Sequence, residues 1–149
     1  MANVTTITRS NYFRCQDPDA VRSVLSACKT DGNPVVTARE GDRIMFYCEG
    51  EIEGMLTPEA AYKMQQDPDW ADDHPDEAWS MEQLCQYLMA HVATDDACCI
   101  MSIGREAMRE IWGDCYIMTR TDMRIINLRQ IVDSAVRDKL KDPQWEFKF

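Results

Sequence analysis

Hydrophobic and polar residues follow two patterns along this chain, and these predict short strands and amphipathic helices. Runs rich in Val, Ile, Tyr and Phe are typical of strands, whereas apolar residues three or four positions apart are typical of helices. The expected strands span residues 4–14, 34–39, 43–49, 97–103, 115–120 and 124–127. The expected helices begin at Pro18 and Pro58, and two more span residues 81–93 and 128–140.

Capping residues mark where three of these helices begin. Asp17 and Thr57 each precede a proline, which is the arrangement of an N-cap followed by the first helical residue. Ser80 and Gln83 have the spacing of a capping box. The final helix is expected to turn its apolar residues toward the core: Leu128, Ile131, Val132, Ala135, Val136 and Leu140.

Glycines predict several of the connections. Gly41 is expected in a tight hairpin turn. Gly50 is expected to form a bulge, past which residues 51–55 extend the preceding strand. Gly104 is expected to end a strand and to lead into a short helix or turn over residues 105–112.

The order of these elements predicts one α+β domain over residues 1–149. The expected core is a ferredoxin-like split βαβ arrangement, in which an antiparallel sheet carries its helices on one face. A C-terminal β-hairpin and helix extend this core, and residues 56–80 add an acidic helix-loop segment. Residues 141–149 are expected to form a tail docked through Trp145 and Phe147.

Charge is distributed unevenly along the chain. The 149 residues include 26 acids and 16 bases, for a formal net charge of −10. Residues 49–96 hold 13 acids and one base, Lys63, whereas the rest of the chain holds 13 acids and 15 bases. Phosphate binding needs clustered Lys and Arg, so the composition argues against a general nucleic-acid binder. Within the acidic part, residues 67–78 also contain Pro68 and Trp70, which predicts a solvated loop.

Cysteine, histidine and acidic residues lack the spacing that metal sites and most enzymes need. The seven cysteines form no CxxC motif, and Cys98 and Cys99 are expected on opposite faces of a strand. His74 and His91 have no regular spacing to any cysteine. Acids in a proline-rich loop are usually solvated, without the separated pKa values that acid–base catalysis requires. We therefore expect reduced cysteines in the core, no metal, no cofactor and no enzymatic activity.

The expected location is the cytoplasm. Residues 1–10 lack the apolar segment of a signal peptide. No apolar run approaches the roughly 20 residues that a membrane span requires. Cysteines without a secretion signal favour a reducing compartment.

Two parts of the chain resemble a known group of proteins. Thr8–Arg14, with the sequence TRSNYFR, and the following Asp17 resemble the start of small acidic proteins encoded by phages and plasmids. Met101–Glu106, Gly113–Ile117 and the helix near Ile131 are similar to their C-terminal part. The resemblance implies a ferredoxin-like domain from a mobile element. Anti-CRISPR and anti-restriction inhibitors of host defence are frequent in that group.

The leading functional hypothesis is a non-enzymatic inhibitor whose acidic surface binds a basic nucleic-acid groove on a host protein or nucleoprotein complex. Acids would supply charge and tryptophans would supply anchors, without direct contact to nucleic acid or membrane. The expected contact residues are Glu59, Asp67, Asp69, Trp70, Asp72, Asp73, Asp76, Glu77 and Trp79. Two alternatives stay open: an intracellular enzyme or small-molecule-binding protein with its site on the open sheet face, and a homo-oligomeric regulatory protein, with a homodimer among the options.

Overall fold

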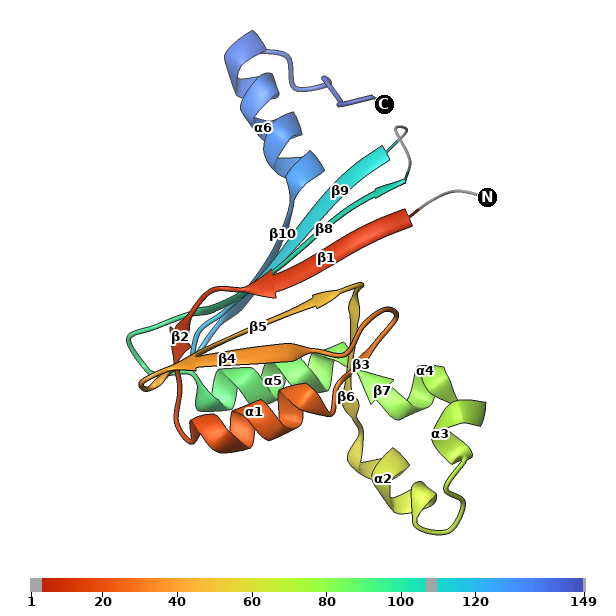
Figure 1. Ribbon diagram of the computed structural model, residues 1–149. Helices are drawn as coiled ribbons and strands as arrows, with labels where there is room; N and C mark the ends of the chain where they lie inside the picture. Colours follow the sequence, from red (N-terminus) through yellow and green to blue (C-terminus); the bar gives the residue numbers. More distant parts are fainter. Residues whose placement is uncertain (1–3, 107–109, 149) are drawn as a thin grey trace.

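A computed structural model describes residues 4–106 and 110–148, and its main feature is a seven-stranded antiparallel sheet (Figure 1). Its strands are β1 (Val4–Ser10), β2 (Phe13–Arg14), β4 (Val36–Glu40), β5 (Arg43–Glu49), β8 (Cys98–Glu106), β9 (Glu110–Met118) and β10 (Met123–Asn127). They lie in the order β10-β9-β8-β1-β5-β4, and β2 continues β1 along the same side of β5. The predicted α+β class is therefore confirmed.

A second, smaller sheet lies at one end of the first. It consists of β3 (Lys29–Thr30), β6 (Ile52–Leu56) and β7 (Trp79–Ser80), in the order β3-β6-β7. The prediction that residues 51–55 extend the preceding strand past Gly50 is wrong. Gly50 adopts a φ of 112°, and its N–H donates to the carbonyl oxygen of Thr6 at 2.8 Å. The chain turns away from β5 at this glycine, so β6 pairs in the smaller sheet.

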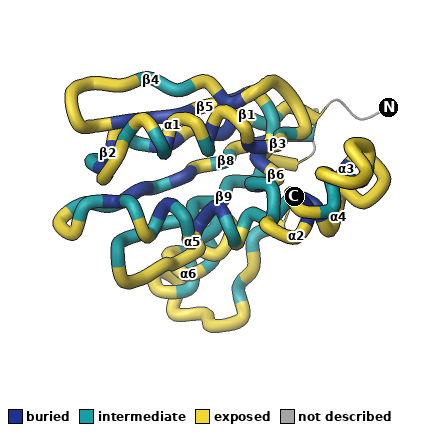
Figure 2. Tube along the Cα trace, turned by 90° about the horizontal axis from the view of Figure 1, so that it is seen from below, coloured by how far each residue is buried: buried dark blue, intermediate teal, exposed yellow. Residues whose placement is uncertain are grey.

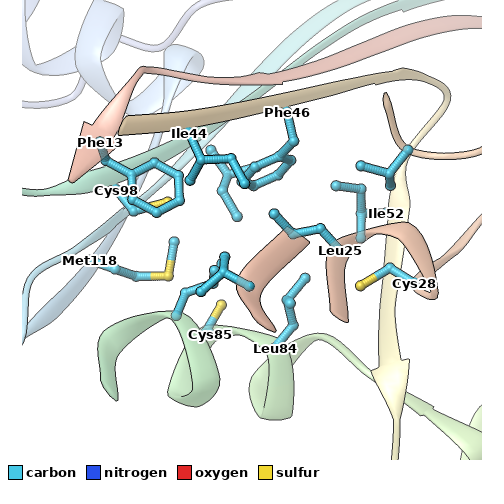
Figure 3. Close-up of a cluster of buried hydrophobic side chains, with 14 of the residues drawn as sticks. Phe13, Leu25, Cys28, Ile44, Phe46, Ile52, Leu84, Cys85, Cys98 and Met118 are labelled. Carbon is cyan, nitrogen blue, oxygen red and sulfur yellow. The ribbon is translucent and has the colours of Figure 1, made fainter. Parts of the chain in front are cut away.

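The hydrophobic core lies between one face of the main sheet and two helices, α1 (Pro18–Ser26) and α5 (Met81–His91) (Figures 1 and 3). Val21 and Leu25 from α1 meet Leu84 and Leu88 from α5, all fully buried. The sheet contributes these buried side chains: Phe13, Ile44, Phe46, Cys48, Cys98, Ile100 and Met118. Alternate residues of each strand point to the same face, which is why Ile44, Phe46 and Cys48 of β5 all belong to this core.

The predicted helix starts are confirmed. The side chain of Asp17 accepts a hydrogen bond from the backbone N–H of Ala20 at the start of α1. Thr57 accepts one from Ala60 in the same way, at the start of α2 (Pro58–Met64). Ser80 accepts the N–H of Gln83 at the start of α5. Each cap satisfies a backbone donor that has no partner within its helix.

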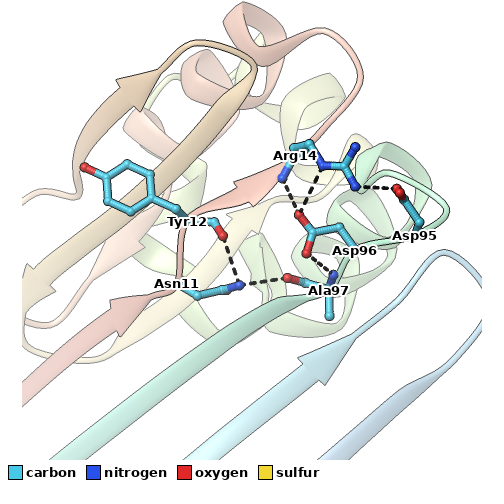
Figure 4. Close-up of polar contacts among 6 residues, drawn as sticks. All are labelled: Asn11, Tyr12, Arg14, Asp95, Asp96 and Ala97. Atoms are coloured by element: carbon cyan, nitrogen blue, oxygen red, sulfur yellow. Dashed lines mark hydrogen bonds and ion pairs between the residues drawn. The ribbon is translucent and has the colours of Figure 1, made fainter.

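Asn11 separates β1 from β2 and fills the gap with its side chain (Figure 4). Its carboxamide oxygen accepts the N–H of Cys99 at 2.8 Å. Its carboxamide nitrogen donates to the carbonyl oxygen of Ala97 at 2.9 Å. The side chain thus supplies the acceptor and donor that the backbone of a further residue of β1 would present to the adjacent segment at residues 97–99. This substitution lets the backbone bend toward β2 without leaving those groups unpaired.

The variant Asn11→Ala is expected to lower the free energy of unfolding by about 2 kcal/mol, because a part-buried donor and acceptor lose their partners together. Urea denaturation followed by circular dichroism measures this loss. Asn33→Ala is the matched control, since the exposed Asn33 carboxamide donates to Glu49 at 3.0 Å on the surface. That control should change the free energy by less than about 0.5 kcal/mol. Equal losses in the two variants would contradict the role assigned to Asn11.

Gly104 lies inside a continuous strand. The prediction that it ends a strand and leads into a helix or turn over residues 105–112 is wrong for the described positions, and residues 107–109 lie outside them. Gly104 is paired with Trp112 on β9, and a Cβ at Gly104 would lie 2.2 Å from the indole ring. The glycine therefore makes room for a cross-strand tryptophan.

Helix α6 (Leu128–Leu140) has the predicted bounds, but the prediction that its apolar residues face the core is wrong. No side chain of this helix is buried. The C-terminal tail lies on it as expected: the backbone N–H of Phe147 donates to Asp133 at 2.7 Å, and Arg137 donates to the carbonyl oxygen of Trp145 at 2.6 Å. The helix follows β10 without a connecting loop, so it leaves the sheet instead of folding back onto the core.

Candidate functional site

Residues 56–80 form a separate projection, which we call the acidic lobe (Figure 1). It contains α2 and two short helices, α3 (Trp70–Asp73) and α4 (Pro75–Ala78). β6 and β7 lie at its two ends and pair with each other, with Leu56 opposite Trp79. The N–H of Thr57 also donates to the carbonyl oxygen of Ala78 at 2.9 Å. The lobe is thus held at both ends by backbone hydrogen bonds.

The prediction of a loop over residues 67–78 is wrong. The N–H of His74 donates to the carbonyl oxygen of Trp70, and the N–H of Ala78 donates to that of His74, so two single helical turns follow one another. Asp72 and Asp73 are the last two residues of α3, and both are exposed. Short turns of this kind leave no apolar periodicity in the sequence. The acids and prolines of residues 67–78 instead give this segment the composition of a loop.

The lobe has a small hydrophobic core of its own. Ala60, Ala71 and Ala78 are buried there. These half-buried side chains pack around them: Leu56, Met64, Trp70 and Trp79. Small alanines at the centre allow the three short helices to approach closely. The lobe therefore presents its surface residues from a packed scaffold.

All seven predicted acidic contact residues lie on the lobe surface and are exposed (Figure 2). They are Glu59, Asp67, Asp69, Asp72, Asp73, Asp76 and Glu77. Lys63 is the one Lys or Arg in residues 56–80, so the lobe carries a formal charge of −6. The Lys63 ammonium lies 3.1 Å from Glu59 and 4.6 Å from the ring centre of Trp70. Its charge thus lies against Glu59 and the Trp70 ring, and the acids of α3 and α4 are exposed.

The two tryptophans of the predicted contact set are partly buried and pack against the small core of the lobe. Trp70 stacks on His74 with ring centres 4.5 Å apart, and it packs against the small core of the lobe. Trp79 is half-buried against the same core and forms part of β7. Both residues hold the acid-bearing helices in place. The contribution of Lys63 and His74 to this packing had no signal in the sequence.

A small polar pocket lies elsewhere, on the helix-covered side of the main sheet. Its lining consists of Thr8, Glu51, Ile52, Met81, Ile100, Ser102, Asp114 and Tyr116. The hydroxyl groups of Thr8 and Ser102 are hydrogen bonded at 2.9 Å. Burial raises the pKa of the Tyr116 phenol, and Cys85, Asp114 and Glu51 raise it further. A phenol with a raised pKa is a poor general base near neutral pH.

The cysteines lie mainly in the core, as predicted. Five are buried and two, Cys99 and Cys115, are partly exposed. Burial raises the pKa of Cys28 to about 12 and that of Cys85 to about 11. Burial also raises the pKa of the partly exposed Cys99 and Cys115. Because the thiolate is the reactive form, raised pKa values make these groups weak nucleophiles.

The described residues contain no group of three or more His, Cys, Asp and Glu side chains placed to hold a metal ion. No helix in residues 4–106 and 110–148 is both long and apolar enough to cross a membrane. The acidic lobe is the feature that gathers the predicted contact residues into one place. No known protein family, curated protein or solved structure matches the chain.

Proposed function

We propose that the protein is a non-enzymatic binding protein whose acidic lobe occupies a basic, nucleic-acid-binding groove on another protein and so inhibits it. The observation that carries this proposal is the exposure of seven carboxylates on one packed lobe held at both ends. A nucleic-acid groove is lined with Lys and Arg spaced to meet a dense row of phosphates. A surface of closely spaced carboxylates carries negative charge, as that row of phosphates does, and can therefore bind in such a groove.

The packing of the lobe strengthens this proposal. Ala60, Ala71 and Ala78 hold the short helices together before any partner arrives. A preorganised surface loses less conformational entropy on binding than a flexible acidic loop would. Uncompensated negative charge also accelerates encounter with a basic partner, and this effect weakens as salt rises.

The order of the elements supports a ferredoxin-like core. β1, α1, β4, β5, α5 and β8 follow one another in the chain, and their strands lie in the order β4-β5-β1-β8. This is the arrangement expected of two interleaved βαβ units with helices on one face. β9, β10 and α6 extend the sheet beyond it. We propose that these additions, with the acidic lobe, adapt a common core to binding.

The resemblance to small phage and plasmid proteins identifies the class of partner to test first. In this proposal the partner is a host complex that targets nucleic acid, such as a restriction or RNA-guided nuclease, and the protein acts in the host cytoplasm as an anti-restriction or anti-CRISPR inhibitor. Its negative charge would compete with the nucleic acid for the basic groove.

The test measures cleavage by a panel of purified restriction and RNA-guided nucleases in the presence of the protein. The double variant Asp72→Lys/Asp73→Lys should weaken binding and inhibition by about tenfold or more, because two exposed charges change sign on the binding surface. Rising salt should weaken inhibition by the unmodified protein.

The matched control is Glu40→Lys/Asp42→Lys, which changes the net charge equally at the exposed turn between β4 and β5. This control should inhibit as well as the unmodified protein. If reversal at Asp72 and Asp73 leaves both binding and inhibition unchanged, the proposal fails. Equal effects of the two double variants would show that net charge matters and that the lobe does not.

A further inference from the structure

The main sheet has a second face that neither α1 nor α5 covers (Figure 1). We call it the open face, and its central residues are Ile7, Met101, Ile103, Ile111, Cys115 and Ile126. α6 lies on this side of the sheet, whereas the acidic lobe lies on the side of α1 and α5 (Figure 1). We propose that the open face and α6 form the interface of a homodimer, in which a second copy of this chain covers both.

Strand register places large apolar side chains next to one another on the open face. Ile7 is opposite Ile103, which in turn is opposite Gly113. The neighbouring row brings Met101 opposite Cys115. Ile103 is 60% exposed and Ile7 is 55% exposed, although both lie in central strands of the sheet. Monomeric proteins rarely expose a contiguous apolar patch of this kind.

Helix α6 adds a second uncovered apolar surface beside the first. An apolar groove runs between the helix and the sheet, lined by Met101, Ile103, Cys115, Ile126, Leu128 and Ile131. Leu128 lies over Gly113, where an added Cβ would be 3.3 Å from the leucine side chain. Amphipathic helices in proteins gain most of their stability from packing an apolar face, yet α6 buries none of its residues. A partner seated in the groove would supply that packing.

The area of exposed surface fits a stable dimer. The chain exposes 9784 Å². A compact monomer of 17.2 kDa exposes about 7,800 Å², so the excess is about 2,000 Å². Stable complexes bury about 800 Å² on each partner, and permanent dimers bury more. The lobe accounts for part of the excess. Of the fourteen exposed large apolar residues that the structure describes, Tyr62 lies in the lobe, whereas the open face and α6 hold Ile7, Met101, Ile103, Ile111, Leu128 and Ile131.

Charged side chains of both signs border the apolar rows of the open face, with arginines in excess. Arg9 lies opposite Met101, Arg105 opposite Ile111 and Arg124 opposite Ile117, whereas Glu49 lies opposite Ile7. A two-fold axis brings each patch against its own copy, so Arg9 of one chain can approach Glu49 of the other. The acidic lobe, on the other side of the sheet, stays outside such an interface (Figure 1). Two chains with a net charge of −10 each can therefore associate without bringing their lobes together.

The experiment is sedimentation velocity over a range of concentrations, with two variants. The unmodified chain should sediment as a dimer, twice the 17.2 kDa of one chain. Ile103→Lys on β8 and Ile131→Lys on α6 should each raise the dimer dissociation constant by about a hundredfold or more, because symmetry places two uncompensated charges in the interface. Both side chains are about half exposed or more, so neither change should alter the far-ultraviolet circular dichroism.

The matched control is Tyr62→Lys, which replaces another exposed large side chain, 63% exposed, on the lobe. It should leave the dimer intact. A chain that is monomeric at about 100 µM, well above the Kd of a stable dimer, would overturn the proposal. So would a dimer that survives both Ile103→Lys and Ile131→Lys, since it would have to use another surface.

Discussion

The variant Gly54→Ala is expected to lose about 4 kcal/mol or more of its free energy of unfolding. Gly54 lies in β6 with a φ of +128°, a conformation that residues with a side chain rarely adopt. An added Cβ would lie 2.1 Å from the carbonyl carbon of Ser80 and 2.4 Å from the nitrogen of Met81. These are backbone atoms at the start of α5, so they cannot move aside without disturbing the cap of that helix. Urea denaturation measures the loss.

Gly41→Ala is the matched control for this prediction. Gly41 also has a positive φ, +64°, but an added Cβ there meets nothing within 4 Å. Only the backbone preference opposes the change, so we expect a loss of about 1 kcal/mol. Similar losses in the two variants would show that the close approach of β6 to α5 is not what Gly54 provides.

The second large effect is expected from Leu88→Ala, which should lower the free energy of unfolding by about 2–5 kcal/mol. Leu88 is fully buried in the middle of α5, where it belongs to the core between the helices and the sheet. Alanine is an excellent helix former, so the change leaves the helix intact and removes only packing. Chemical denaturation of the purified variant, followed by tryptophan fluorescence, reports the loss.

Gln86→Ala serves as the control on the same helix. Gln86 is exposed two positions before Leu88, and the substitution should change the free energy of unfolding by less than about 0.5 kcal/mol. A small loss for Leu88→Ala would contradict the packing of α5 against the main sheet.

Local signals in the sequence located most elements of this fold. Asp17, Thr57 and Ser80 mark helix starts because a side-chain oxygen next to a free backbone N–H is a strictly local requirement. The hairpin at Gly41 is also a local feature, because its turn needs a positive φ at a single residue. The bounds of α6 were predicted correctly, but the direction of its apolar face was not. Periodicity shows that a helix has an apolar face and does not show what covers that face.

The wrong predictions share a physical cause: long-range contacts, which local sequence patterns do not show, determine the structure at these positions. Gly50 was expected to form a bulge within one strand and Gly104 to end a strand, yet Gly50 turns the chain into another sheet and Gly104 accommodates Trp112 within a strand. β3 and β7 span two residues each and carry no periodicity. For the candidate site, the acids were evident because they are close in the chain. The packing role of Trp70 and Trp79 was not, since it depends on alanines up to 19 residues away.

The pairing of β6 with β7 affects which changes in length and sequence the acidic lobe can tolerate. Because Leu56 and Trp79 are neighbours across a ladder, the chain enters and leaves the lobe at nearly the same point. A segment with adjoining ends can be shortened, lengthened or exchanged while the rest of the fold keeps its connections. The lobe is therefore a replaceable insert. Grafting it between two paired strands of an unrelated scaffold would show whether its binding properties are portable.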